Sequence, residues 1–167
     1  KNRALVVVGN GRGGVGFGVG RHKDAARSVE LAIANAERDM IYISTYKGQL
    51  YHDLMGKKNN IKVLIHTRGP GHDNPAGDII AQTVLECAGI RSAMAKIIGP
   101  ARRNPYTVVQ AIFDAFSMHL PYDKTAWDRG MRLVNMGADR HAARTVYPNS
   151  AKGPKMLGTH YGTRSNQ

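Results

Sequence analysis

The feature that most constrains the fold of this chain is residues 15–20, VGFGVG, in which glycine alternates with larger residues. A period of two is typical of a β-strand, because successive side chains of a strand point to opposite faces of a sheet. A second apolar run, Ala4 to Val8, comes before it, and the glycine-rich residues 9–14 separate the two runs. Glycine readily adopts the positive φ angles that hairpin turns require. The sequence therefore predicts a β-hairpin at this point.

A helix is predicted directly after the hairpin, where apolar residues recur every three or four positions. Asp24 stands at the expected start of this helix, where its side chain would cap free backbone N–H groups. Residues 40–44 are expected to leave the helix as a short extended segment. The helix should cover one face of the hairpin with the apolar positions Ala26, Val29, Ile33, Ala36 and Met40.

A second domain with the order ββαβα is predicted from about Gly48 onward. Gly89 is placed to end its first helix in a left-handed conformation, and Asn104 followed by Pro105 is a typical helix start. The predicted elements are strands over 49–54 and 61–65, a long polar loop over 67–75, a helix over 80–88, a strand over 92–99 and a helix from 104 with Val108, Val109, Ile112, Phe113 and Phe116 on its buried face.

Residues 120–167 lack the periodicity of either element type, and prolines interrupt them. They also carry many large side chains, including Trp127, which a fully disordered tail would not need. We expect a basic, irregular C-terminal extension that becomes ordered against a partner, because such segments gain their burial on binding. The expected fold class is α+β, with domains over 1–46 and 47–119 followed by this extension.

The charge of the chain predicts a nucleic-acid partner. It has 24 lysine and arginine residues against 12 aspartate and glutamate residues, a net charge of +12, and such an excess repels itself unless an anion offsets it. No apolar run approaches the roughly 20 residues of a membrane helix, so no membrane partner is expected. The single Cys87 excludes an intrachain disulfide, and the histidines lack metal-ligand spacing. Neither a metal nor another cofactor is expected.

Gly9, Gly11 and Gly14 match the GxGxxG pattern of dinucleotide-binding turns. In such a turn the third glycine opens a helix that faces the pyrophosphate, whereas here a strand pattern continues. No acidic residue ends a second strand about 20 positions later, where a ribose would need it. The pattern thus indicates a hairpin turn. Arg12 and the basic residues 21–23 are expected to cluster around its bare backbone, which a phosphate chain could approach closely.

The same residues resemble the signature of a known family. Residues 4–11 followed by Gly14 to Gly18 are similar to protein five of the small ribosomal subunit (the uS5 family), in which this hairpin precedes a helix rich in alanine and basic residues. The likeness continues in order and covers residues 4–119. Its later parts are Lys62 to Ile65, Val84 to Ile90, Ala95 with Lys96, Gly99, Asn104 with Pro105, and Val108 with Val109.

This resemblance implies a double-stranded-RNA-binding-like N-terminal domain, incomplete at its start, joined to the family's own ββαβα C-terminal domain. It implies a structural constituent of the small ribosomal subunit, without catalysis, that binds rRNA, supports assembly and helps form the channel through which mRNA enters. The implied partners are small-subunit rRNA, mRNA near that channel and the neighbouring ribosomal proteins of families four and eight. A free-standing RNA-binding regulator is the alternative, and a nucleotide-binding enzyme is a third possibility.

Three departures from the family pattern predict a mitochondrial member. The family's basic strand and loop before Ala4 are not shown by this sequence, and the extension 120–167 is not bacterial in type. The loop 67–77 has the residues HDNP at 72–75, where bacterial members are richer in glycine. Any targeting segment would lie upstream of Lys1. A bacterial cytoplasmic protein is the alternative.

The residues expected to bind RNA are mainly basic side chains assigned to turns. Any one of them could be a solvated surface charge, but together they offer cations to phosphates, whose neutralisation releases counterions. Arg27 is preferred to Arg38 because it lies nearer the basic turn, and Phe17 is expected to pack in the core instead of stacking on a base. The predicted RNA-binding residues are Asn10, Arg12, Arg21, His22, Lys23, Arg27, Lys57, Lys58, Lys62, Arg68, Arg102 and Arg103.

Overall fold

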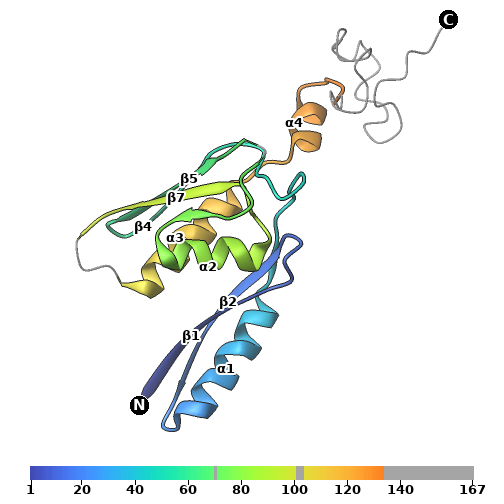
Figure 1. Ribbon diagram of the computed structural model, residues 1–167. Helices are drawn as coiled ribbons and strands as arrows, with labels where there is room; N and C mark the ends of the chain where they lie inside the picture. The colour runs from blue at the N-terminus through green and yellow to red at the C-terminus, as the bar shows by residue number, and fades with distance from the viewer. Residues whose placement is uncertain (70, 101–103, 134–167) are drawn as a thin grey trace, which may run out of the picture. The chain divides into compact units, whose positions relative to one another are not determined.

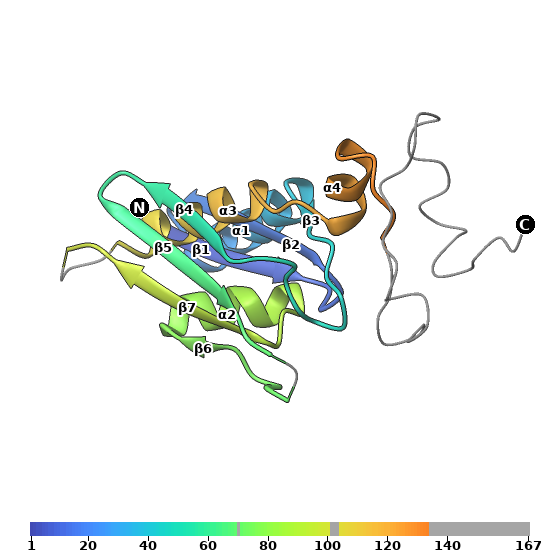
Figure 2. The same cartoon turned by 90° about the horizontal axis from the view of Figure 1, so that it is seen from above.

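The computed structural model describes residues 1–69, 71–100 and 104–133, and the chain divides into two compact units, Lys1–His119 and Leu120–Gln167. The first unit has a three-stranded sheet of order β1-β2-β3 and a four-stranded sheet of order β4-β5-β7-β6 (Figure 1). Helices α2 and α3 lie between the four-stranded sheet and the β1–β2 hairpin, and α1 covers the hairpin's other face (Figure 2). This arrangement confirms the α+β fold class.

The predicted hairpin is confirmed as strands β1 (Asn2–Gly9) and β2 (Gly14–His22). The strands pair antiparallel with Val7 opposite Phe17, and the short strand β3 (Ile41–Tyr42) pairs with the start of β2. Phe17 packs against helix α3 (Pro105–Ser117), where its ring centroid lies 4.6 Å from that of Phe113. The preference for a core position of Phe17 is therefore confirmed.

Helix α1 (Ala25–Arg38) packs on the hairpin, but of the predicted side chains only Ala36 is buried there. Its buried residues are Ser28, Ala32 and Ala36, spaced four apart. Each lies over one of the alternating glycines of β2, so that a Cβ on Gly18 would overlap the carbonyl oxygen of Ala32. The predicted stripe was wrong at its other positions because a glycine surface lets the helix backbone approach, which selects small residues for the contact. Larger residues of the stripe stand at the edge of that contact, with Val29, Ile33 and Met40 37–43% exposed.

The predicted cap of α1 is only partly correct. Asp24 occupies the N-cap position, but its side chain makes no capping hydrogen bond. Its backbone N–H instead donates to Nδ1 of His22 at 3.1 Å. Asp78 and Asn104 do cap helices α2 (Ile79–Ala88) and α3 (Pro105–Ser117), by accepting hydrogen bonds from Ile80 N and Tyr106 N.

The first strand of the second sheet lies later in the chain than predicted. Strand β4 is Leu54–Lys58 and β5 is Ile61–Thr67, so the predicted strand over 49–54 was wrong. Asn59, which has a φ of 53°, makes the tight turn between them, and the polar segment expected as a loop therefore continues the ladder. Lys47 and Gly48, both with positive φ, form a separate tight turn at residues 46–49. That turn ends at Gln49, where the strand was expected to begin.

The remaining elements follow the prediction with two additions. Strand β7 (Ala93–Ile98) lies beside β5. A two-residue strand β6 (Ala76–Gly77), directly after the predicted loop, pairs parallel to β7. In the second unit, residues 122–128 form the helix α4 (Tyr122–Asp128), so the expectation of a wholly irregular extension was wrong there.

An aromatic stack joins the linker before β4 to the end of α3. The ring of His119 lies 5.4 Å from that of Tyr51 and 5.2 Å from that of His52, and His119 Nε2 accepts a 3.4 Å hydrogen bond from the backbone N–H of Tyr51. Burial, followed by repulsion from His52, lowers the pKa of His119 below its ordinary value. Protonation would also remove the acceptor atom from this contact.

We therefore expect the free energy of unfolding to fall as the pH drops below about 6.5, the ordinary histidine pKa. The direction follows because the unfolded state binds the proton more tightly than the folded state. The stabilisation by neutral His119 is therefore complete above that pH and is lost as the pH falls through the lower pKa of the folded state. Urea unfolding of the wild type and His119→Gln between pH 7 and 5 measures the effect. The variant should show the flatter pH dependence, and parallel curves would contradict this account.

Candidate RNA-binding surface

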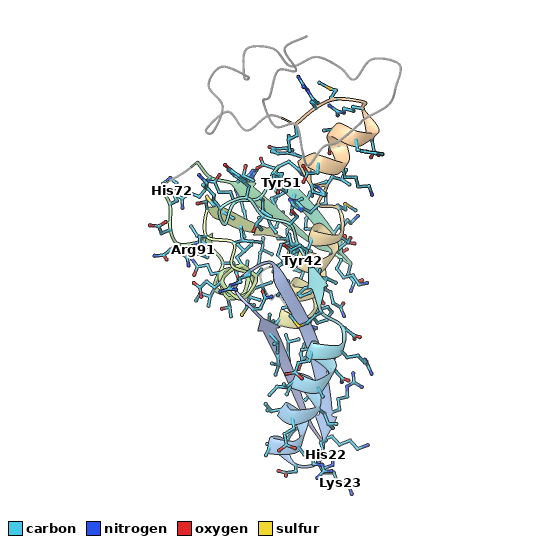
Figure 3. All side chains as sticks on the ribbon, turned by 90° about the vertical axis from the view of Figure 1, so that its right-hand side faces the viewer. His22, Lys23, Tyr42, Tyr51, His72 and Arg91 are labelled. Atoms are coloured by element: carbon cyan, nitrogen blue, oxygen red, sulfur yellow. The ribbon has the colours of Figure 1, made fainter. Side chains whose placement is uncertain are left out.

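Four of the predicted RNA-binding residues gather where β2 ends and α1 begins. Arg21 and His22 close the strand, Lys23 lies in the turn, and Arg27 is in the first turn of the helix. Figure 3 shows His22 and Lys23 at the end of the hairpin that is farthest from Tyr42. A hydrogen bond from strand β1 stabilises the turn, because Asn2 Nδ2 donates to the Lys23 carbonyl oxygen at 3.0 Å. The structure thus presents these side chains on an ordered connection.

Arg3 joins this group, although the sequence prediction did not include it. Hairpin pairing places Arg3 directly opposite Arg21 on the neighbouring strand. The Arg3 guanidinium lies 4.0 Å from the ring centroid of Tyr106, and the Tyr106 hydroxyl donates to the Arg3 carbonyl oxygen at 3.3 Å. The sequence could have indicated Arg3, because the register of the predicted hairpin determines which residue lies opposite Arg21. We call Arg3, Arg21, His22, Lys23 and Arg27 the basic end.

No acidic side chain forms an ion pair with the basic end within the described parts of the chain. Arg21, Lys23 and Arg27 are exposed, while His22 is half-buried. Direct opposition of two like charges on a sheet, as in Arg3 and Arg21, is unfavourable for the free protein. An anion at this end would remove that repulsion, and phosphate suits it because guanidinium groups bind phosphate oxygens through two hydrogen bonds.

Asn10 and Arg12 lie at the opposite end of the hairpin, in its turn. Asn10 Oδ1 accepts hydrogen bonds from the backbone N–H groups of Arg12 and Gly14, at 2.8 and 2.9 Å, and so shapes the turn. The side chain of Arg12 is exposed. The expected cluster of Arg12 with residues 21–23 was wrong, because a strand rises about 3.3 Å per residue and so holds the two groups roughly 25 Å apart.

The glycine-rich turn docks on the C-terminal end of α2. The N–H groups of Gly11 and Gly13 donate to the carbonyl oxygens of Cys87 and Ala88, at 3.0 and 2.8 Å. These carbonyls belong to the last turn of a helix, where no partner exists within the helix itself. The expectation of a bare backbone is only partly correct, because Gly13 and Gly14 are buried whereas residues 9–12 are exposed. Among the glycines of the turn, Gly11 is the one at which an added Cβ would meet no atom within 4 Å.

The other predicted residues are dispersed over the second sheet and its loops. Lys57 and Lys58 lie on β4 instead of in the expected turn, and Lys62 lies on β5, within the stretch predicted as a strand. Arg68 follows β5 and is half-buried, with its N–H donating to the Ser92 carbonyl oxygen at 2.9 Å. Arg102 and Arg103 lie outside the described residues. The twelve predicted residues therefore do not form one continuous site.

The described residues offer little support for chemistry of another kind. Within 1–69, 71–100 and 104–133 there is no group of three or more histidine, cysteine or acidic side chains that could hold a metal ion. Burial, followed by the charge of Glu86, raises the pKa of the Cys87 thiol above its ordinary value, which disfavours the nucleophilic thiolate. Every helix within these residues is too short or too polar to cross a membrane.

Comparison with known proteins agrees with the architecture. Residues 1–44 match the family model "Ribosomal protein S5, N-terminal domain", and residues 56–129 match "Ribosomal protein S5, C-terminal domain". The small ribosomal subunit proteins uS5 of Brucella anthropi, Brucella canis and Brucella suis are each 35% identical over 139 residues, which is 83% of this chain and 73% of the relative. The chain therefore belongs to the ribosomal protein S5 family and is a structural, non-enzymatic constituent of the small ribosomal subunit.

Proposed function

We propose that the chain binds small-subunit rRNA through its basic end and thereby fixes its own position during subunit assembly. The supporting observation is the group of five basic residues that the hairpin and α1 bring together without an acidic partner among the described residues. Lysine and arginine contacts to phosphates position a protein on folded RNA and do not read its base sequence. A binding mode of this kind fits a structural constituent of a particle.

The setting that we propose is the small subunit of the mitochondrial ribosome, next to the channel through which mRNA enters. Ribosomal proteins of families four and eight are the proposed neighbours, as the family resemblance implies. The support for a mitochondrial source is the residues HDNP at 72–75 and the extension 120–167. Sedimentation of the tagged full chain tests this setting, and its absence from mitochondrial small subunits would contradict it.

The contribution of the basic end is tested with the triple variant Arg21→Ala, Lys23→Ala, Arg27→Ala. If each side chain neutralises one phosphate, the slope of log affinity against log salt should fall by about 2 to 3, and affinity for small-subunit rRNA should drop on the order of a hundredfold. Filter binding from low to moderate salt measures both quantities. Arg12 and Asn10 at the hairpin turn are proposed to make a separate, weaker contact.

A charge-matched control separates a site from a diffuse effect of net charge. Arg38→Ala, Lys47→Ala, Arg91→Ala removes three exposed cations outside the predicted set. This control should retain most of the affinity and most of the salt slope. An equal loss in both triple variants would mean that the chain binds RNA through its overall charge. For Lys57, Lys58, Lys62, Arg68, Arg102 and Arg103, contact with rRNA stays a prediction.

A further inference from the structure

The four-stranded sheet has one face that no helix of the first unit covers. Residues of β4, β5 and β7 alternate between buried and exposed, and the buried set packs in the common core with α2 and α3. We call the other side of these strands the open face. Its side chains are those of Met55, Lys57, Lys62, Leu64, His66, Met94, Lys96 and Ile98.

The apolar residues of the open face are unusually exposed for their type. Met55 is 59% exposed, Met94 44% and Ile98 46%, and Leu64 is half-buried. The strand register places Met55 opposite Leu64, and Leu64 diagonally adjacent to Met94. Met55, Leu64 and Met94 therefore form one diagonal apolar row across three strands, whereas Ile98 stands opposite Lys62 and outside this row. Contiguous exposed apolar surface on a folded protein marks a contact site.

Lysines form a second row beside the apolar one. Lys57 stands directly opposite Lys62, and Lys96 occupies the next diagonal position on β7. Like charges directly opposite each other weaken a sheet, so the free protein is destabilised by Lys57 and Lys62. Two carboxylates beside this face already have partners: Asp53 accepts hydrogen bonds from His66 and Thr67 at 2.7–3.1 Å, and Asp114 accepts one from the backbone N–H of Lys57 at 3.1 Å. Among the described residues, none of these three lysines forms an ion pair with a carboxylate.

We propose that the open face binds a segment of another protein that carries one row of apolar and one row of acidic side chains. Carboxylates would neutralise Lys57, Lys62 and Lys96, while apolar side chains cover the row of Met55, Leu64 and Met94. Methionine suits such a contact because its flexible side chain adapts to the shape of a partner. RNA fits less well, because phosphates would leave the apolar row in water and the face has no phenylalanine, tyrosine or tryptophan ring on which a base could stack. Its one imidazole, that of His66, is hydrogen-bonded to Asp53.

This proposal goes beyond rRNA binding and assigns Lys57 and Lys62 to a protein contact. It is tested in cells that express the full chain with a photo-activatable amino acid in place of Met94. We expect a crosslink to a protein segment that contains both acidic and apolar residues. Lys57→Glu with Lys62→Glu should reduce the crosslink yield at least tenfold, whereas Lys57→Arg with Lys62→Arg should preserve it. Arg38→Glu with Lys47→Glu, the same change of charge elsewhere, should also preserve it.

The other outcomes overturn the proposal. A crosslink mainly to RNA, a crosslink to another part of the same chain, or no crosslink at all would each exclude an acidic protein partner. Unchanged yield in the charge-reversal variant would exclude the role of the lysines. Thermal unfolding of each variant checks that the exposed substitutions leave the fold intact. Sedimentation of the crosslinked product separates this question from the ribosomal setting, because an acidic partner found outside small subunits would contradict the setting alone.

Discussion

Gly18→Ala is expected to lower the free energy of unfolding by about 3 kcal/mol or more, because overpacking at a backbone contact cannot be relieved by a rotamer change. A Cβ at this position would overlap the carbonyl oxygen of Ala32 and the amide nitrogen of Ala36. Both atoms belong to the helical backbone of α1, so the helix would have to lift from the hairpin. Urea unfolding monitored by circular dichroism measures the loss.

Gly69→Ala is the matched control for Gly18→Ala. A Cβ on Gly69 would meet no atom within 4 Å, and its backbone φ is not in the left-handed region. The substitution should change the free energy of unfolding by less than about 0.5 kcal/mol, as is usual at exposed sites. Similar stability of the two variants would show that α1 does not rest on the glycine surface of β2.

Gly89→Ala is expected to cost about 3 kcal/mol and to release the hairpin turn from α2. Gly89 has a φ of 76°, a conformation that costs other residues about 1–2 kcal/mol. The added Cβ would also overlap the carbonyl oxygen of Gly11, which supplies the rest of the loss. Hydrogen exchange gives a local measurement, because the N–H groups of Gly11 and Gly13 donate to α2 and should lose protection.

Gly11→Ala provides the control for backbone strain alone. Its φ of 66° is close to that of Gly89, but a Cβ there would meet nothing within 4 Å. We expect a loss of about 1 kcal/mol, with the Gly13 N–H still protected. If the two alanine variants lost equal stability, the contact between the hairpin turn and α2 would contribute nothing beyond strain.

The parts of the fold that the sequence predicted well are those set by local chemistry. Alternation fixed the hairpin, and Asn104 with Pro105 marked the start of α3, because capping and strand periodicity depend on neighbouring residues. The buried side of α1 could not be found this way. Periodicity favoured Val29 and Ile33, but the glycine surface that selects Ala32 for burial lies on another element.

The candidate site shows the same division between local and distant effects. Arg21, His22 and Lys23 were predicted together correctly, since they are adjacent in the chain. Arg12 was grouped with them although the length of β2 separates it from them. The open face was missed because the start of β4 was placed too early. With the strand over 49–54, Lys57 fell in a loop and its position opposite Lys62 was hidden.

The hairpin is fastened at both of its ends, by the glycine turn on α2 and by Arg3 on Tyr106 of α3. Because both ends of the hairpin contact helices of the same unit, the hairpin cannot pivot about either contact alone. The end that carries Arg21 and Lys23 therefore keeps a fixed distance and direction from the sheet that carries Met55 and Met94. Two binding partners engaged by these surfaces would be set at a constant spacing, so that the first unit would serve as a rigid bracket between them.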